Sequence, residues 1–160
     1  MFVLIMGVTG SGKTSVGTLL SAAMDWPFYD ADDFHSSANV RKMASGVPLT
    51  DEDRGPWLEK LHELISQCNE RGESGVLACS ALKENYRRIL CADADVAVVY
   101  LKVHRDLIRF RLERRSGHYM PQGLIESQFH DLEEPQDCIL IDGAWPPERI
   151  VGSIRSQIER

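Results

Sequence analysis

Eight consecutive residues near the N-terminus have the most specific chemical meaning in this sequence. Residues 7–14 read GVTGSGKT and match the phosphate-loop pattern GxxxxGK followed by Ser or Thr. The glycines let backbone N–H groups turn inward around phosphate oxygens, at places where a Cβ atom would clash. We therefore predict that the phosphates of ATP bind to Gly7, Val8, Thr9, Gly10, Ser11, Gly12, Lys13 and Thr14.

Two side chains of this loop carry the predicted chemistry. Lys13 can reach the β- and γ-phosphates and is a catalytic candidate, and the Thr14 hydroxyl can ligate Mg²⁺. A chance match in a glycine-rich turn is the alternative. The apolar residues 2–6 and the amphipathic segment after the loop argue against chance, because a phosphate loop joins a strand to a helix whose N-terminus faces the phosphates.

Two acids follow the second short apolar segment, which ends at Asp30. The carboxyl ends of neighbouring parallel strands share one crevice, so Asp30 and Asp32 are expected to face the nucleotide. Asp30 could hold Mg²⁺ through water, and Asp32 could accept the proton of an attacking hydroxyl. The alternative is a solvated acidic turn in which Asp33 caps the next helix. No acid follows the apolar segment 76–79, so metal binding is predicted to depend on Thr14 and Asp30.

Arginines are concentrated in a segment of helical periodicity: Arg105, Arg109, Arg111, Arg114 and Arg115. The spacing places Arg111, Arg114 and Arg115 on one helical face. We interpret the segment as part of a lid over the transferring phosphoryl group, with Arg114 and Arg115 as catalytic candidates and Arg111 as an ATP ligand. A surface helix with scattered salt bridges is the alternative. Arg54 is a separate candidate, because it could bind an acidic substrate bidentately.

The elements that position these residues alternate between apolar segments and helical periodicity, which is typical of an α/β fold with a parallel sheet. The expected strands are residues 2–6, 27–30, 76–79, 96–101 and 138–141. The expected helices begin near Lys13, at 33, at about 51, at 83, at 104, at 122 and at Pro146-Pro147.

The second of these helices is expected to cover residues 33–44. The third is the clearest, and Asp51 or Asp53 is expected to cap it, with Pro56 in its first turn. Right-handed crossovers place helices on both sheet faces, so we predict one three-layer domain over residues 1–160.

The composition excludes several other classes of protein. The chain has 160 residues and a net charge of −6, which argues against a general nucleic-acid or membrane-surface binder. The sequence contains no apolar run near the roughly 20 residues that span a bilayer. The four cysteines form no metal-binding pattern, and we expect free thiols in a reducing compartment, the cytoplasm.

Several motifs together resemble the gluconokinases of the small phosphate-loop type. They are GVTGSGKT, FYDADDFH, NVRKMASGVPLTDEDRGPWL, LACSALKENYR, RSGHYMP, LIESQF and LEEP. The resemblance extends from Met6 to about Pro135. It implies a fold similar to shikimate kinase and the nucleoside monophosphate kinases, with five parallel strands in the order 2-3-1-4-5. It also implies ATP-dependent phosphorylation of D-gluconate to 6-phosphogluconate for the pentose phosphate pathway, and a homodimer.

The resemblance also implies roles for individual residues. Asp30 and Asp32 match the paired acids that such enzymes use for metal and substrate, and Arg54 matches the residue that holds the substrate carboxylate. The lid is expected at about 111–131, with Arg111, Arg114 and Arg115. The remaining substrate-binding candidates lie in similar motifs: His35, Lys83, His118 and Gln128.

Two other functions remain open at this point. One is a kinase of another small hydroxy acid, such as shikimate. The other is a regulator that binds ATP without transferring phosphate. The paired acids and the arginines argue against a regulator, because a sensor of ATP needs no site for a hydroxyl acceptor.

Overall fold

The sheet of this computed structural model has the predicted strand order. The structure describes residues 1–115 and 122–160. In this part of the chain, five parallel strands pair in the order β2-β3-β1-β4-β5. The strands are β1 (Phe2–Met6), β2 (Phe28–Asp30), β3 (Gly75–Ala78), β4 (Val96–Lys102) and β5 (Ile139–Asp142). The α/β class and the order implied by the resemblance are confirmed.

Helices connect the strands. In the described residues they are α1 (Lys13–Met24), α2 (Ser37–Ala44), α3 (Asp51–Glu70), α4 (Glu84–Cys91), α5 (Arg105–Glu113), α6 (Gln122–Asp131) and α7 (Pro147–Ile158). A short 3-10 turn, η1 (Ala31–Phe34), follows β2. Each helix except α2 starts within a few residues of its predicted position.

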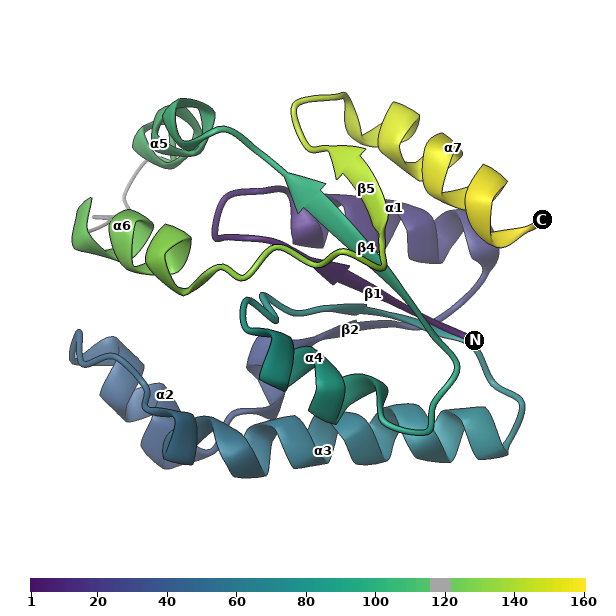
Figure 1. The fold of residues 1–160 in the computed structure, drawn as a ribbon, viewed down its shortest axis with the longest axis horizontal. Coiled ribbons are helices and arrows are strands. Elements are labelled where there is room, and N and C mark those ends of the chain that lie inside the picture. Colours follow the sequence, from purple (N-terminus) through teal and green to yellow (C-terminus); the bar gives the residue numbers. More distant parts are fainter. Residues whose placement is uncertain (116–121) are drawn as a thin grey trace.

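The central strand β1 is apolar throughout because both of its faces are covered. Phe2, Leu4 and Met6 belong to the core cluster that α3 and α4 complete. Val3 and Ile5 belong to the cluster that α1 and α7 complete. Figure 1 shows these two helix pairs on opposite faces of the sheet. Burial on both faces explains why the sequence identifies this strand so clearly.

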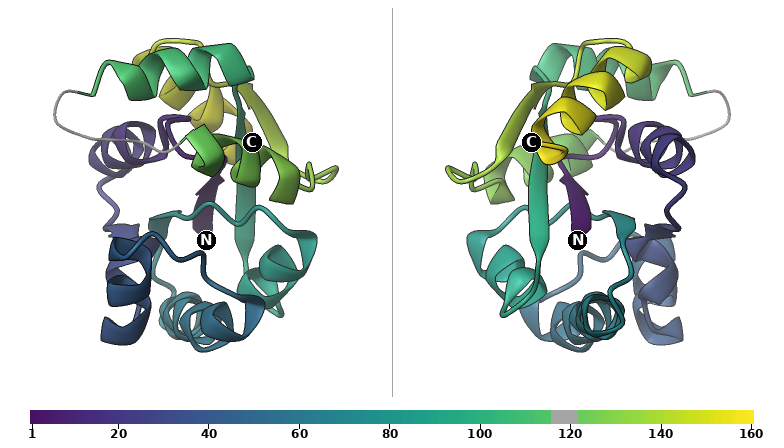
Figure 2. Two further views of the ribbon diagram at one scale, coloured as in Figure 1. Left: turned by 90° about the vertical axis from the view of Figure 1, so that its left-hand side faces the viewer. Right: turned by 90° about the vertical axis from the view of Figure 1, so that its right-hand side faces the viewer.

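The helices α5 and α6 lie at the carboxyl ends of the strands, beside the phosphate loop (Figure 1 and Figure 2). A third apolar cluster holds them there, and it contains Val8, Leu82, Val103, Ile108, Leu112 and Ile125. Because Val8 belongs to the loop itself, α5 and α6 pack directly against the segment that is expected to bind ATP.

The segment 33–44 forms two elements and not the single predicted helix. The 3-10 turn ends at Phe34, and α2 begins only after Ser36. Ser36 caps α2 by accepting the N–H of Asn39 at 3.1 Å. The alternative in which Asp33 caps this helix is therefore wrong, because the serine next to the helix supplies the acceptor oxygen.

Thr50 caps α3, in place of the predicted Asp51 or Asp53. Its Oγ1 accepts the N–H of Asp53 at 3.1 Å, and an Asp53 carboxylate oxygen accepts the N–H of Thr50 at 2.9 Å. This reciprocal pair is a capping box, so Asp53 contributes from inside the first turn. Pro56 lies inside the helix beyond its first turn, and the prediction of its position is wrong by about two residues.

Candidate active site

The phosphate loop connects β1 to α1 and leaves the N-terminus of α1 open to an anion. Gly12, the N-cap of α1, adopts φ 101°, and none of the described side chains caps the helix there. At Gly7, a Cβ atom would lie 2.7 Å from the Ser11 Oγ and 3.0 Å from the Leu101 carbonyl oxygen. The loop therefore requires glycine at these positions, and the uncapped N-terminus of α1 is the type of place where backbone N–H groups bind an anion.

Lys13 folds back over the loop. Its Nζ donates to the carbonyl oxygens of Gly7 at 3.0 Å and Val8 at 2.9 Å. Burial lowers the pKa of Lys13 to about 8, although the negative charges of Asp32 and Asp30 act in the opposite direction. The lysine and both predicted acids therefore belong to one electrostatic site.

The two acids lie at the end of β2 and in the turn after it. An Asp30 carboxylate oxygen accepts the N–H of Asp32 at 3.0 Å. Burial, and next the charge of Asp30, raise the pKa of Asp32, while His35 and Lys13 lower it. A carboxylate with a raised pKa is a better proton acceptor than an ordinary aspartate.

Cys79 occupies the position after β3 where many phosphate-loop proteins carry an acid. Its side chain is buried, close enough to Lys13, Asp30 and Asp32 for their charges to act on it. Burial raises the pKa of the Cys79 thiol to about 12, so this side chain is neutral at physiological pH. It therefore supplies no negative charge for a metal ion.

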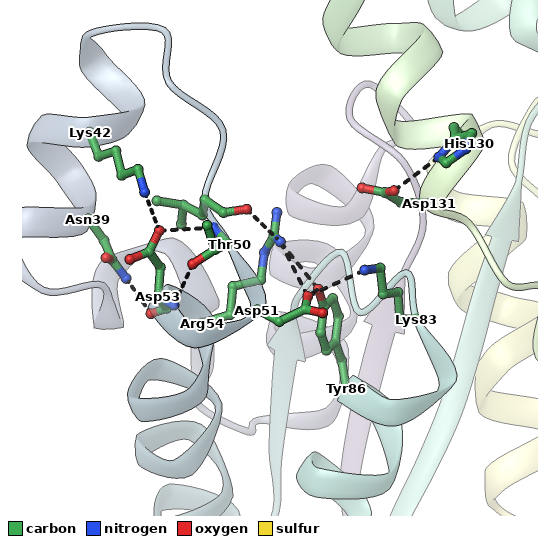
Figure 3. Close-up of polar contacts among 11 residues, drawn as sticks. Asn39, Lys42, Thr50, Asp51, Asp53, Arg54, Lys83, Tyr86, His130 and Asp131 are labelled. Carbon is green, nitrogen blue, oxygen red and sulfur yellow. Dashed lines mark hydrogen bonds and ion pairs between the residues drawn. The ribbon is translucent and has the colours of Figure 1, made fainter.

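Arg54 and Lys83 lie close together although 29 positions separate them, and Asp51 and Tyr86 complete their cluster (Figure 3). Arg54 Nη1 donates to the Leu49 carbonyl oxygen at 2.9 Å and to the Tyr86 hydroxyl at 3.2 Å. Lys83 Nζ donates to Asp51 at 3.3 Å, and the Tyr86 hydroxyl donates to the same carboxylate. We call these four residues, Asp51, Arg54, Lys83 and Tyr86, the cation cluster.

The two cations of this cluster were predicted from the sequence as site residues, whereas Asp51 and Tyr86 were not. A usable pattern was present, because Asp51 and Arg54 are three residues apart in one helix. Lys83 and Tyr86 have the same spacing at the start of the next helix. Such spacing places each pair on one helical face.

His35 stacks on an aromatic ring beside the acids. Its ring lies 4.2 Å from that of Trp57, at an interplanar angle of 14°. Burial lowers the pKa of His35, although Asp32 raises it. The side chain is therefore a neutral hydrogen-bonding group at neutral pH.

The predicted lid arginines have different surroundings. Arg111 Nη1 donates to the carbonyl oxygens of Gly10 at 3.1 Å and Ser11 at 3.3 Å, and its Nη2 donates to that of Gly143 at 2.7 Å. In this structure Arg111 thus stabilises the phosphate loop by binding its backbone carbonyl oxygens. Arg105 and Arg109 instead pair with Glu126 of α6, as in the salt-bridged surface helix considered above.

The next two arginines, at the end of α5, are exposed. The Arg114 guanidinium lies 4.9 Å from the Phe110 ring. Arg115 is close enough to Lys13 for its charge to lower the pKa of that lysine. Of the described lid candidates, Arg115 is therefore the one with an electrostatic effect on the loop lysine.

Gln128 reaches the phosphate loop from α6. Its Oε1 accepts the N–H of Thr9 at 2.6 Å. Gln128 was predicted to bind the acceptor, whereas in the structure it contacts the loop that is expected to bind ATP. His118, the remaining predicted ligand, lies outside the described residues.

The described residues show no ready-made metal centre and no membrane-spanning element. No group of three or more His, Cys, Asp or Glu side chains is arranged there to hold a metal ion. None of the helices among residues 1–115 and 122–160 is both long and apolar enough to cross a bilayer. A cavity of about 280 Å³ lies between α2 and α3, and its lining includes Asn39, Trp57 and Lys60 but no residue of the phosphate loop.

Comparison with known proteins agrees with this geometry. Residues 9–135 match the family model described as "Shikimate kinase". A probable gluconokinase of Mus musculus is 47% identical over an alignment of 150 residues, and the match covers 82% of each chain. The thermosensitive gluconokinase of Escherichia coli is 42% identical over an alignment of 144 residues, and the match covers 87% of this chain and 77% of the relative.

A solved structure indicates the same family. The crystal structure of a gluconokinase from Sinorhizobium meliloti superposes with a TM-score of 0.87 at 36% identity, covering 99% of this chain and 91% of that one. The resemblance noted in the sequence motifs is thereby confirmed. The phosphate loop, the paired acids and these relatives all lead to one conclusion. The chain belongs to the gluconokinases, which are kinases of the shikimate kinase family.

Proposed function

We propose that this protein transfers the γ-phosphoryl group of ATP to the 6-hydroxyl of D-gluconate. The observation that carries the proposal is the position of the cation cluster, because Arg54 and Lys83 lie together at the end of the sheet that also carries the phosphate loop and both acids. A small acceptor with one carboxylate and several hydroxyls matches this combination of cations and acids. The gluconokinase relatives favour gluconate among such acceptors.

In the proposed reaction, Asp32 removes the proton of the 6-hydroxyl as its oxygen attacks the γ-phosphorus. A new oxygen–phosphorus bond forms, the bond from the γ-phosphorus to the bridging oxygen breaks, and ADP leaves with that oxygen. The raised pKa of Asp32 suits a base. Lys13 would leave its loop carbonyls to contact the β- and γ-phosphates, and Arg114 and Arg115 would stabilise the charge on the transferred group.

Mg²⁺ fits the donors present, which are the oxygen ligands that this ion prefers. The exposed Thr14 hydroxyl and the Asp30 carboxylate, the latter through water, would hold it together with the ATP phosphates. When bound, the ion neutralises charge on the β- and γ-phosphates. The neutral thiol of Cys79 is consistent with a metal held by the nucleotide and few protein ligands.

The acceptor site is proposed to use the cations for the carboxylate and the remaining polar groups for the hydroxyls. Arg54 and Lys83 bind the carboxylate, while His35, His118 and Asp30 contact hydroxyls. Gln128 remains a candidate on the acceptor side, although in this structure it bonds to Thr9.

We propose further that residues 1–160 act as one kinase domain with a lid at about 111–131. The resemblance to gluconokinases supports a homodimer in the cytoplasm. A sedimentation measurement on the purified protein tests the dimer, and a single monomeric species would contradict it.

A coupled assay of ADP release tests the function. The purified protein is given Mg²⁺–ATP with gluconate, shikimate, glycerate or a nucleoside monophosphate. We expect release that depends on gluconate, and mass spectrometry should detect a phosphogluconate. Turnover of shikimate without turnover of gluconate would favour the alternative kinase, and ATP binding without acceptor-dependent release would favour a regulator.

A further inference from the structure

One oxygen of Asp51 takes the position that the acceptor carboxylate needs. The Tyr86 hydroxyl and Lys83 Nζ both donate to Asp51 Oδ1, the latter at 3.3 Å. Arg54 Nη1 lies 3.9 Å from the same oxygen. A single carboxylate oxygen among three donors is the geometry expected of a bound acid, and here the acid belongs to the protein.

Arg54 is held in place without Asp51, and the Tyr86 ring contacts both cations. The buried Tyr86 ring lies 5.6 Å from the Arg54 guanidinium carbon and 5.6 Å from Lys83 Nζ. Arg54 also donates to the Leu49 carbonyl oxygen and to the Tyr86 hydroxyl. Since these contacts fix the more buried cation, the main effect of Asp51 on the cluster is its charge.

Asp51 can also leave the cluster. Its side chain is 65% exposed, compared with 26% for Arg54 and 31% for Lys83. It is the first residue of α3, so its carboxylate can rotate into water beside the helix N-terminus, where negative charge is favourable. The donors of Arg54, Lys83 and Tyr86 would then be free for a ligand.

We propose that Asp51 is a specificity-determining residue that competes with the acceptor's carboxylate for Arg54 and Lys83. This inference rests on the proposed function. A small anion that displaces Asp51 gains only the contacts that Asp51 loses. Because it has no net advantage, the small anion is excluded. A sugar acid gains those contacts and further ones from its hydroxyls, so it displaces Asp51.

The variant Asp51→Asn tests this inference, with Glu52→Gln as its control. Both substitutions remove one negative charge from the first turn of α3, but among the described contacts only Asp51 touches the cations. Two unit charges about 4 Å apart in water attract one another only weakly, which corresponds to about a five-fold change in affinity. We expect the KM for gluconate to fall about five-fold in Asp51→Asn and to stay unchanged in Glu52→Gln.

A simple carboxylate gives an independent measurement. Acetate binding is measured by calorimetry with a non-hydrolysable ATP analogue filling the phosphate loop. We expect acetate to bind about five-fold more tightly to Asp51→Asn than to the unsubstituted protein. Melting curves of both variants show whether the fold is kept.

The two possible failures can be told apart. A KM for gluconate that rises or stays constant in Asp51→Asn overturns the role of Asp51 while the proposed function stands. If the unsubstituted protein does not phosphorylate gluconate, the proposed function fails. The acetate measurement then decides the inference, and equal acetate affinity in the two proteins overturns it.

Discussion

Replacing Arg111 with methionine separates a structural role from a role in phosphoryl transfer. The guanidinium donates to the carbonyl oxygens of Gly10, Ser11 and Gly143, and Nη1 is shared between the first two. A hydrogen bond to a charged group contributes about 1.5–3 kcal/mol net, so two effective bonds contribute about 3–6 kcal/mol. Arg111 is only half-buried, and in the variant water can replace part of these hydrogen bonds. We therefore expect the free energy of unfolding to fall by about 3 kcal/mol.

The loss is measured from the melting temperature and from urea unfolding. For a chain of this size, 1 kcal/mol corresponds to about 2–4 °C, so Arg111→Met should melt about 6–12 °C lower. The KM for ATP should also rise, because the phosphate loop loses the hydrogen bonds that Arg111 donates to it. Arg109→Met is the matched control, since its ion pair with Glu126 is long and exposed and should contribute less than about 1 kcal/mol.

One result would refute this account of Arg111. If Arg111→Met melts at the same temperature as Arg109→Met but loses most of its kcat, the guanidinium acts on the transferred phosphoryl group. The lid role predicted from the sequence would then be correct, and the contacts with the loop carbonyls would belong to an inactive arrangement.

Three further predictions concern the loop, the base and the start of α3. Lys13→Met should abolish turnover and leave the circular dichroism spectrum unchanged; residual turnover near the unsubstituted rate would contradict the role of Lys13. Asp32→Asn should lower kcat far more than it weakens ATP binding measured by calorimetry. Because the pKa of Asp32 is raised and a base must be deprotonated, kcat should fall at a higher pH on acidification than an ordinary aspartate would allow. The hydrogen bond from Lys42 lowers the pKa of Asp53 to about 2, so its stabilising effect is complete above about pH 4 and is lost as pH falls towards 2. Asp53→Asn should therefore unfold more readily than the unsubstituted protein at pH 7 and equally readily near pH 2, as measured by urea titration.

The fold could be predicted from the sequence because its strands are buried on both faces. An apolar segment such as Phe2–Met6, placed before a phosphate loop, can be interpreted only as a buried strand. Helical segments between such strands then predict a parallel sheet, because each helix connects one strand to the next. The segment 33–44 was harder to interpret, because apolar periodicity alone does not show that a serine cap begins the helix four residues later. Caps depend on single hydrogen bonds, which composition does not reveal.

The types of residue in the candidate site could be predicted from the sequence. The groups that each side chain contacts were harder to predict. The spacing of the arginines gave a correct helix, but it could not show that Arg111 turns towards backbone carbonyls, since a carbonyl has no sequence signature. Arg54 and Lys83 were found as separate cations. Their meeting around Tyr86 depends on how α3 and α4 pack, which is a tertiary contact between segments far apart in the chain.

The contacts between the phosphate loop and the helices α5 and α6 connect the loop that is expected to bind ATP with two helices that carry residues of the expected lid. Arg111 and Gln128 bond to the loop backbone, and a Cβ atom at Gly10 would lie 3.3 Å from the Leu112 side chain. The loop therefore cannot change conformation without these helices. By reciprocity of linked equilibria, whatever factor ATP contributes to the affinity for the acceptor, the acceptor contributes equally to the affinity for ATP. If ATP binding shifts these helices against the acceptor, the two substrates will therefore bind cooperatively, and the same coupling factor will be measured from either side.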